Sequence, residues 1–106
     1  MITGHYRPDG TLRAVDVDYE QLDPATRLDI CEWVKLHKLD PGLVPIRVEI
    51  GFDPATEEWV FPTYVPGDHG HGIKVDPTTR KPLLRRVRRR TVAWIPRANG
   101  QLLHAA

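Results

Sequence analysis

A chain of 106 residues, of which 41% are hydrophobic, has apolar material for one core and predicts a single domain over residues 1–106. Its one cysteine, Cys31, excludes an internal disulfide and a cysteine-based zinc site. No stretch approaches the roughly 18 apolar residues of a membrane span, and the first residues lack a signal-peptide profile, so we expect a cytoplasmic protein that does not bind membranes.

The formal net charge of +1 hides an uneven distribution of charge along the chain. Residues 1–58 contain 12 acidic and 6 basic side chains, whereas residues 59–106 contain 2 acidic and 9 basic ones. The two halves therefore have opposite charge, which is typical of a protein with a charged binding surface.

The first predicted element is a β-hairpin. The segment Arg7-Pro8-Asp9-Gly10-Thr11 combines a fixed proline φ, an aspartate that bonds the backbone and a glycine, which is the composition of a tight turn. Residues 2–7 and 12–19 are the expected arms.

A helix over residues 23–39 follows. Asp23 is a good N-cap and Pro24 suits the first helical position, while Asp40-Pro41-Gly42 is expected to end the helix. His37, near the end, is expected to interact with the helix dipole.

Helical periodicity gives this helix two apolar stripes. The main one, expected to pack on the sheet, contains Leu28, Ile30, Cys31, Val34 and Leu39. Cys31 is expected to be a buried structural residue. Trp33 and Leu36 form the second stripe, which either lies under residues 92–103 or contacts a partner or a second copy of the chain.

The remaining segments are predicted to form strands. Alternating patterns predict strands over 44–50 and 59–65, with Pro62 placing the second at an edge or a bulge. A short strand over 72–75, a basic strand from about residue 82, and a terminal hairpin around Asn99-Gly100 complete the series. We therefore predict an α+β fold in which one helix packs on an antiparallel sheet of six or seven strands built from β-hairpins.

The basic strand is the strongest functional signal. In a strand, Arg86, Arg88 and Arg90 point to one face, and Arg85 and Arg89 to the other, so neither face can be deeply buried. The strand could contact a protein or a nucleic-acid backbone. Alternatively, it is a solvated edge strand, or its arginines pair with acids of the first half.

Two histidines in a glycine-rich loop are weak candidates for a metal site. His69 and His71 lie two residues apart, and His5 or His104 could add a third ligand. Because the spacing fixes no third ligand, we expect an exposed loop and no cofactor.

No nucleophile-base pair, phosphate loop or paired carboxylates can be argued from this sequence. We therefore expect a non-enzymatic protein that binds a macromolecular partner, most plausibly a protein, through Arg85, Arg86, Arg88, Arg89 and Arg90 and through the stripe of Trp33 and Leu36. Nucleic-acid binding by the same arginines is the alternative, and a small histidine-metal enzyme is the third hypothesis.

A stylistic resemblance points the same way. In its length, its 11 arginines against 4 lysines, its three Asp-Pro-x-Thr turns and the phrase Ile30-Cys31-Glu32-Trp33-Val34, the chain resembles small accessory proteins of phages that infect actinobacteria. Such proteins often bind a host protein, so the resemblance implies binding in the host cytoplasm. It includes no functional motif, and no site residue follows from it.

Overall fold

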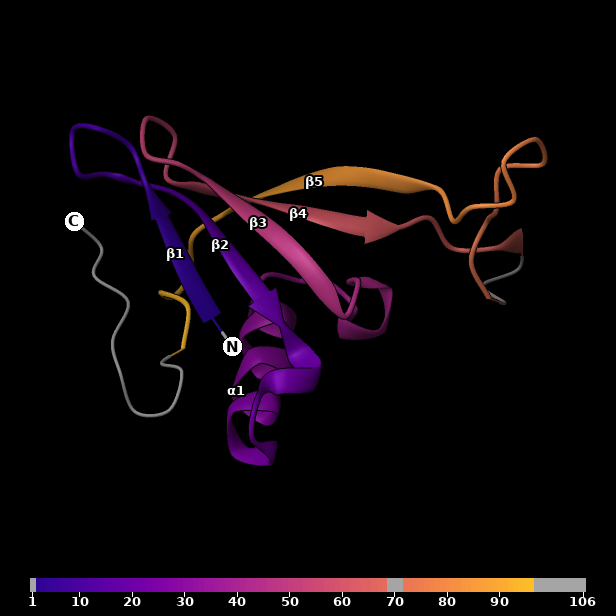
Figure 1. Ribbon diagram of the computed structural model, residues 1–106, viewed down its shortest axis with the longest axis horizontal. Coiled ribbons are helices and arrows are strands. Elements are labelled where there is room, and N and C mark those ends of the chain that lie inside the picture. Colours follow the sequence, from indigo (N-terminus) through magenta and orange to yellow (C-terminus); the bar gives the residue numbers. More distant parts are fainter. Residues whose placement is uncertain (1, 69–71, 97–106) are drawn as a thin grey trace.

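The computed structural model, described here for residues 2–68 and 72–96, has one helix packed against one face of an antiparallel sheet (Figure 1). In chain order the elements are β1 (Ile2–Tyr6), β2 (Leu12–Asp18), α1 (Pro24–Leu36), β3 (Arg47–Asp53), β4 (Glu58–Tyr64) and β5 (Leu84–Arg90), with 3₁₀ turns at Tyr19–Gln21 and Pro41–Leu43. The spatial order of the strands is the chain order, β1-β2-β3-β4-β5.

The α+β architecture was predicted, but the expected six or seven strands are wrong. The described residues form five strands. Residues 72–75 contribute only isolated bridges, Pro66 with Ile73 and Val75 with Pro82. Residues 91–96 form no strand, and the rest of the predicted terminal hairpin lies outside the described residues.

The first hairpin is confirmed. At its tip the Arg7 amide donates to the Thr11 carbonyl (2.7 Å) and the Gly10 amide to the Arg7 carbonyl (2.9 Å). Gly10 has a φ of +90°, which glycine adopts without strain. Asp9 accepts a hydrogen bond from the Thr11 amide (3.0 Å), as expected of an aspartate in a turn.

Helix α1 begins as predicted but ends three residues early. The Asp23 carboxylate caps it by accepting from the Thr26 amide, and Pro24 is its first residue. At the other end Lys38 has a φ of +59°, the Leu39 amide donates to the Val34 carbonyl and the Lys38 amide to the Lys35 carbonyl. This is a Schellman cap, and it ends the helix before the Asp-Pro-Gly sequence.

The buried face of α1 differs from the predicted stripe. It contains Thr26, Ile30, Trp33, Val34 and, just beyond the helix, His37. Leu28, assigned to the core-facing stripe, is 67% exposed. At 100° per residue, the centre of the buried arc lies between Ile30 and His37, about 100° from the centre of the predicted stripe, and Trp33 lies at one edge of the arc.

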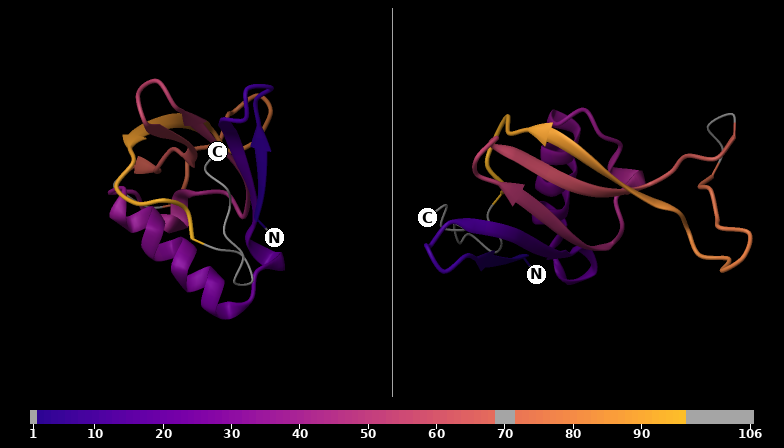
Figure 2. Two further views of the ribbon diagram at one scale, coloured as in Figure 1. Left: turned by 90° about the vertical axis from the view of Figure 1, so that its left-hand side faces the viewer. Right: turned by 90° about the horizontal axis from the view of Figure 1, so that it is seen from above.

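The chain after β5 returns along α1 and covers Trp33 (Figure 2). Trp33 Nε1 donates to the Ala93 carbonyl (2.9 Å), and the Val92 amide donates to His37 Nε2 (3.1 Å). Ile95 is buried in the same core cluster. For Trp33 this agrees with the alternative in which residues 92–103 cover the second stripe; of that segment, residues 97–103 lie outside the described residues.

The inner face of the sheet carries the rest of the core. Val15 and Val17 of β2 face α1 together with Ile50 of β3, and Trp59 and Phe61 of β4 are fully buried. The Trp33 ring contacts those of Trp59 and Phe61, with centroids 5.1 and 5.3 Å apart. No helix in the described part of the chain is long and apolar enough to cross a membrane.

The sheet divides between β3 and β4. β3 begins at Arg47, three residues later than predicted, and pairs with β2 over Arg47–Gly51. It pairs with β4 only over Gly51–Asp53, whereas β4 continues along β5 to Tyr64. The two strands therefore diverge beyond Gly51 and Val60, a divergence visible in Figure 1. Pro62 lies in this divergent part, where β4 lacks β3 as a neighbour.

Candidate binding surface

The arginine strand is β5, at one edge of the five-stranded sheet. Its pairing with β4 places Arg86 and Arg88 opposite Pro62 and Val60, on the face away from α1. Arg85 and Arg89 lie opposite Thr63 and Trp59, on the other face. The predicted alternation of the arginines is thus confirmed, and no residue of β5 is buried.

One of these arginines is neutralised by acids of the first half. Arg88 donates from Nη2 to Asp53 Oδ2 (2.7 Å) and from Nε to Glu58 Oε1 (3.1 Å), which ties β5 to the turn between β3 and β4. Arg85, Arg86, Arg89 and Arg90 make no ion pair with another described residue. Arg88 is therefore a structural arginine, and the others carry free positive charge.

Asp53, Glu58 and Arg88 form the Arg88 cluster, and each of these charged side chains shifts the pKa values of the others. A hydrogen bond from Arg88 lowers the pKa of Asp53, and hydrogen bonds from Thr56 and then from Arg88 lower that of Glu58. In return, Glu58 and then Asp53 raise the pKa of Arg88. The ion pairs form only while both carboxylates are ionised.

We predict that Arg88→Met lowers the melting temperature at neutral pH and has a progressively smaller effect in acid. A carboxylate whose pKa is lowered by folding stabilises the folded state above its ordinary pKa of about 4, and this contribution is lost as pH falls through the lowered value. Thermal unfolding of both proteins between pH 7 and pH 2 measures the difference. Arg90→Met is the matched control and should leave stability unchanged at each pH; equal losses for the two variants would contradict the assignment.

The chain between β4 and β5 forms an arm that projects beyond the body of the domain (Figure 1). Backbone hydrogen bonds hold its base, from the Val65 amide to the Leu83 carbonyl (3.1 Å) and from the Leu83 amide to the Lys74 carbonyl (2.9 Å). Its exposed aliphatic side chains, with the first residue of β5, are Ile73, Val75, Leu83 and Leu84. The arm thus presents apolar surface beside the free arginines of β5.

A cleft of about 600 Å³ lies between the diverging strands β3 and β4, and we call it the strand cleft. One wall is formed by Pro45 and by Arg47, Val48, Glu49 and Gly51 of β3. The other is formed by Pro62 and Tyr64 of β4 and by Leu84, Arg85 and Arg86 of β5. Most of these residues belong to the sheet face away from α1.

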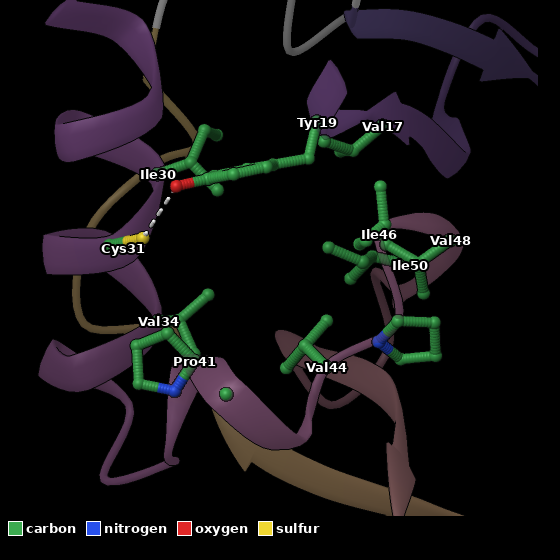
Figure 3. Close-up of a pocket in the computed structure, with 12 residues that line it drawn as sticks. Val17, Tyr19, Ile30, Cys31, Val34, Pro41, Val44, Ile46, Val48 and Ile50 are labelled. Atoms are coloured by element: carbon green, nitrogen blue, oxygen red, sulfur yellow. Dashed lines mark hydrogen bonds between the residues drawn. The ribbon is translucent and has the colours of Figure 1, made fainter. Parts of the chain in front are cut away.

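A second hollow, about 300 Å³ in volume, opens between α1 and β3 and is lined mainly by aliphatic side chains (Figure 3). Cys31 of α1 lies on one side, with its Sγ 3.6 Å from the Tyr19 hydroxyl. This hydrogen bond, followed by burial, raises the pKa of Tyr19. No charged residue or histidine is among the lining residues, so this pocket offers apolar contact without a general base. Cys31, predicted to be buried, is partly exposed here.

The two residues of the second predicted stripe of α1 differ in exposure. Trp33 is 2% exposed and Leu36 is 53% exposed. A partner can therefore contact Leu36 but not Trp33, and the stripe no longer forms an aromatic anchor.

The predicted histidine pair, His69 and His71, lies outside the described residues. Of its candidate third ligands, His5 pairs with Asp16 at 2.5 Å, and His104 is also outside the described residues. Within residues 2–68 and 72–96, no three histidine, cysteine, aspartate or glutamate side chains are grouped as a metal site.

The strand cleft was not foreseen from the sequence. The two signals that could have indicated it are Pro45 and Pro62, since each lacks the N–H that a continuous β3–β4 ladder needs. His37, predicted to interact with the helix dipole, is hydrogen-bonded to the Trp33 carbonyl in the last turn of α1 and is buried between α1 and the returning chain.

Comparison of the chain with protein-family models, with curated proteins and with solved structures found no match.

Proposed function

We propose that this chain is a non-enzymatic binding protein that engages an acidic surface of another protein through β5 and the adjoining arm. The observation that carries the proposal is the presence of unpaired arginines on an edge strand, beside exposed aliphatic side chains. Arginine and apolar residues together are typical of interface centres. Complementary charge accelerates association and selects the partner.

The exposed aliphatic residues favour a protein over a nucleic acid. Proteins that bind single strands stack successive bases on several aromatic side chains, but Trp33 and Trp59 are buried in the core, and Tyr64 is the one aromatic residue among those that line the strand cleft. Duplex binding depends on many phosphate contacts, and here Arg88 is already neutralised by Asp53 and Glu58. Ile73, Val75, Leu83 and Leu84 have no role on a phosphate backbone, whereas they supply apolar contact area to a protein.

The free arginines remain the observation that favours nucleic acid as the second candidate. Binding of that kind would weaken steeply with salt, because counterions are taken up again when the phosphates are released. Retention on a 20-base-pair duplex at 50 and 200 mM salt separates the two candidates.

We expect Arg86→Glu together with Arg90→Glu to abolish partner capture while leaving the fold intact. Both side chains are on the face away from α1, and neither is in an ion pair with a described residue. Because Arg90 lies opposite Glu58, thermal unfolding of the double variant checks that the Arg88 ion pairs and the fold are retained. The measurement is affinity capture from a nuclease-treated actinobacterial extract, with the retained proteins identified by mass spectrometry.

Lys35→Glu with Lys38→Glu is the matched control, because it makes the same charge change at and just beyond the end of α1. Proteins retained by the native chain and by this control, but lost from the arginine variant, would support the proposal. Capture that is absent, or that the arginine substitutions leave unchanged, would contradict it, and capture that requires intact nucleic acid would favour the second candidate.

A further inference from the structure

The strand cleft presents free strand edge as well as charge. β3 pairs with β2 along Arg47–Gly51, but its other edge pairs with β4 only from Gly51 onward. Over residues 47–50 this edge therefore has no strand partner within the described chain. Four residues of strand span about 13 Å, which is enough for a short extended segment to pair by backbone hydrogen bonds.

β4 provides a poorer edge than β3 in this cleft. Pro62, in the middle of the divergent part of β4, has no N–H to donate. Residues 47–50 of β3 include no proline, so each carries both a donor and an acceptor. An incoming strand would therefore pair with β3 and lie against the side chains of β4 and β5.

The charge of the cleft selects the chemistry of that segment. The only acid in its lining is Glu49, whose Oε1 is already 3.4 Å from Arg13 Nη1. On the opposite wall, Arg85 and Arg86 have no ion-pair partner among the described residues. Val48 and Leu84 add apolar surface between these charges.

We infer that the strand cleft receives an extended acidic segment of the partner protein, which adds a strand to β3 and places its carboxylates against Arg85 and Arg86. This inference rests on the proposed function and specifies where and how the partner is held. Because side chains alternate along a strand, acids on one face of the segment would lie on the side of Arg86, and the residues between them would lie on the side of Arg85 and Val48.

A set of defined peptides tests this inference. The probe is a fluorescein-labelled library of eight-residue peptides in which Asp or Glu alternates with Val, Ile or Thr, and binding is measured by fluorescence anisotropy. We expect saturable binding to the native protein and at least a 100-fold loss with Arg85→Glu combined with Arg86→Glu. The Lys35→Glu and Lys38→Glu control should bind as the native protein does.

The same library with alternate backbone nitrogens methylated separates strand addition from simple charge attraction. N-methylation keeps every side chain and charge but removes donors that a strand needs, so we expect methylated peptides to bind at least tenfold more weakly. Hydrogen exchange should slow at the amides of Arg47 and Glu49, which the alternation of the strand directs to the open edge, when the unmodified library binds. Equal affinity of the two libraries, or unchanged exchange in β3, would overturn the inference.

Different experimental results would contradict the cleft inference and the proposed function. If acidic peptides do not bind but Arg86→Glu with Arg90→Glu still abolishes capture from the extract, the arginine surface binds a partner by another mode and the cleft inference is wrong. If the capture does not depend on the arginines, the proposed function itself is contradicted.

Discussion

Trp33→Ala is expected to lower the free energy of unfolding by about 3–5 kcal/mol, the usual cost of truncating a large buried aromatic side chain. Trp33 is 2% exposed and contacts the rings of Trp59, Phe61 and His37. The substitution also removes the hydrogen bond from its indole to the Ala93 carbonyl. Domains of this size are commonly stable by about 5–15 kcal/mol, so the variant should be partly unfolded in mild urea, as measured by circular dichroism.

Two further variants test whether the loss of stability comes from the buried contacts of Trp33. Trp33→Phe keeps most of the packing and loses the hydrogen bond, so its cost should lie between those of the native residue and alanine. Leu36→Ala removes an apolar side chain from the same helix at an exposed position and should change stability by less than about 0.5 kcal/mol. A loss for Leu36→Ala as large as that for Trp33→Ala would contradict the buried face assigned to α1.

His37→Ala is expected to cost about 2–4 kcal/mol, because it leaves a cavity and removes the hydrogen-bond partner of two backbone groups. The ring is 1% exposed, its Nδ1 lies 2.8 Å from the Trp33 carbonyl, and its Nε2 accepts the hydrogen bond from the Val92 amide. Because Nε2 accepts, the proton is on Nδ1, which donates to the carbonyl. One side chain thus joins the end of α1 to the chain that follows β5. Urea unfolding measures the cost.

Partial rescue separates the two hydrogen bonds of His37. Asparagine places an amide nitrogen near the position of Nδ1, and glutamine places an oxygen near that of Nε2. His37→Asn and His37→Gln should each recover part of the stability lost in His37→Ala. If neither variant is more stable than alanine, the loss is due to packing alone and the hydrogen-bonding role is wrong.

Local chemistry made the turns and the helix start predictable. The Pro-Asp-Gly sequence at the first hairpin and the Asp23-Pro24 pair at α1 act through neighbouring backbone groups, so their effect is independent of the rest of the fold. The alternation of Arg86 and Arg88 with Arg85 and Arg89 was equally accessible, since it needs only the geometry of a strand.

Features set by distant parts of the chain were not predictable in the same way. The cap that ends α1 after Leu36 places Lys38 in a left-handed conformation, although no glycine in the sequence marks this position. Trp33 and His37 belong to the core because the chain after β5 returns to cover them, a contact across more than 50 residues. The predicted number of strands was too high for a related reason. Residues 72–75 have a strand-like pattern, but they form only isolated bridges with other parts of the chain.

The sequence predicted which arginines belong to the candidate site, but it did not predict how they are arranged. The sequence identifies a row of arginines, but it does not distinguish Arg88, which Asp53 and Glu58 neutralise, from Arg86, which lines the strand cleft. That distinction depends on the register between β4 and β5 and on the turn that brings Asp53 beside Glu58.

The same arginines also determine what β5 will not pair with. A second copy of the chain, aligned antiparallel about Val87, would place Arg85 opposite Arg89 and Arg86 opposite Arg88. Like charges directly opposite each other destabilise a strand pair, so edge-to-edge polymerisation through β5 is disfavoured in every molecule of this protein. The exposed edge can therefore remain open in a concentrated solution of identical chains while staying available to a strand of opposite charge.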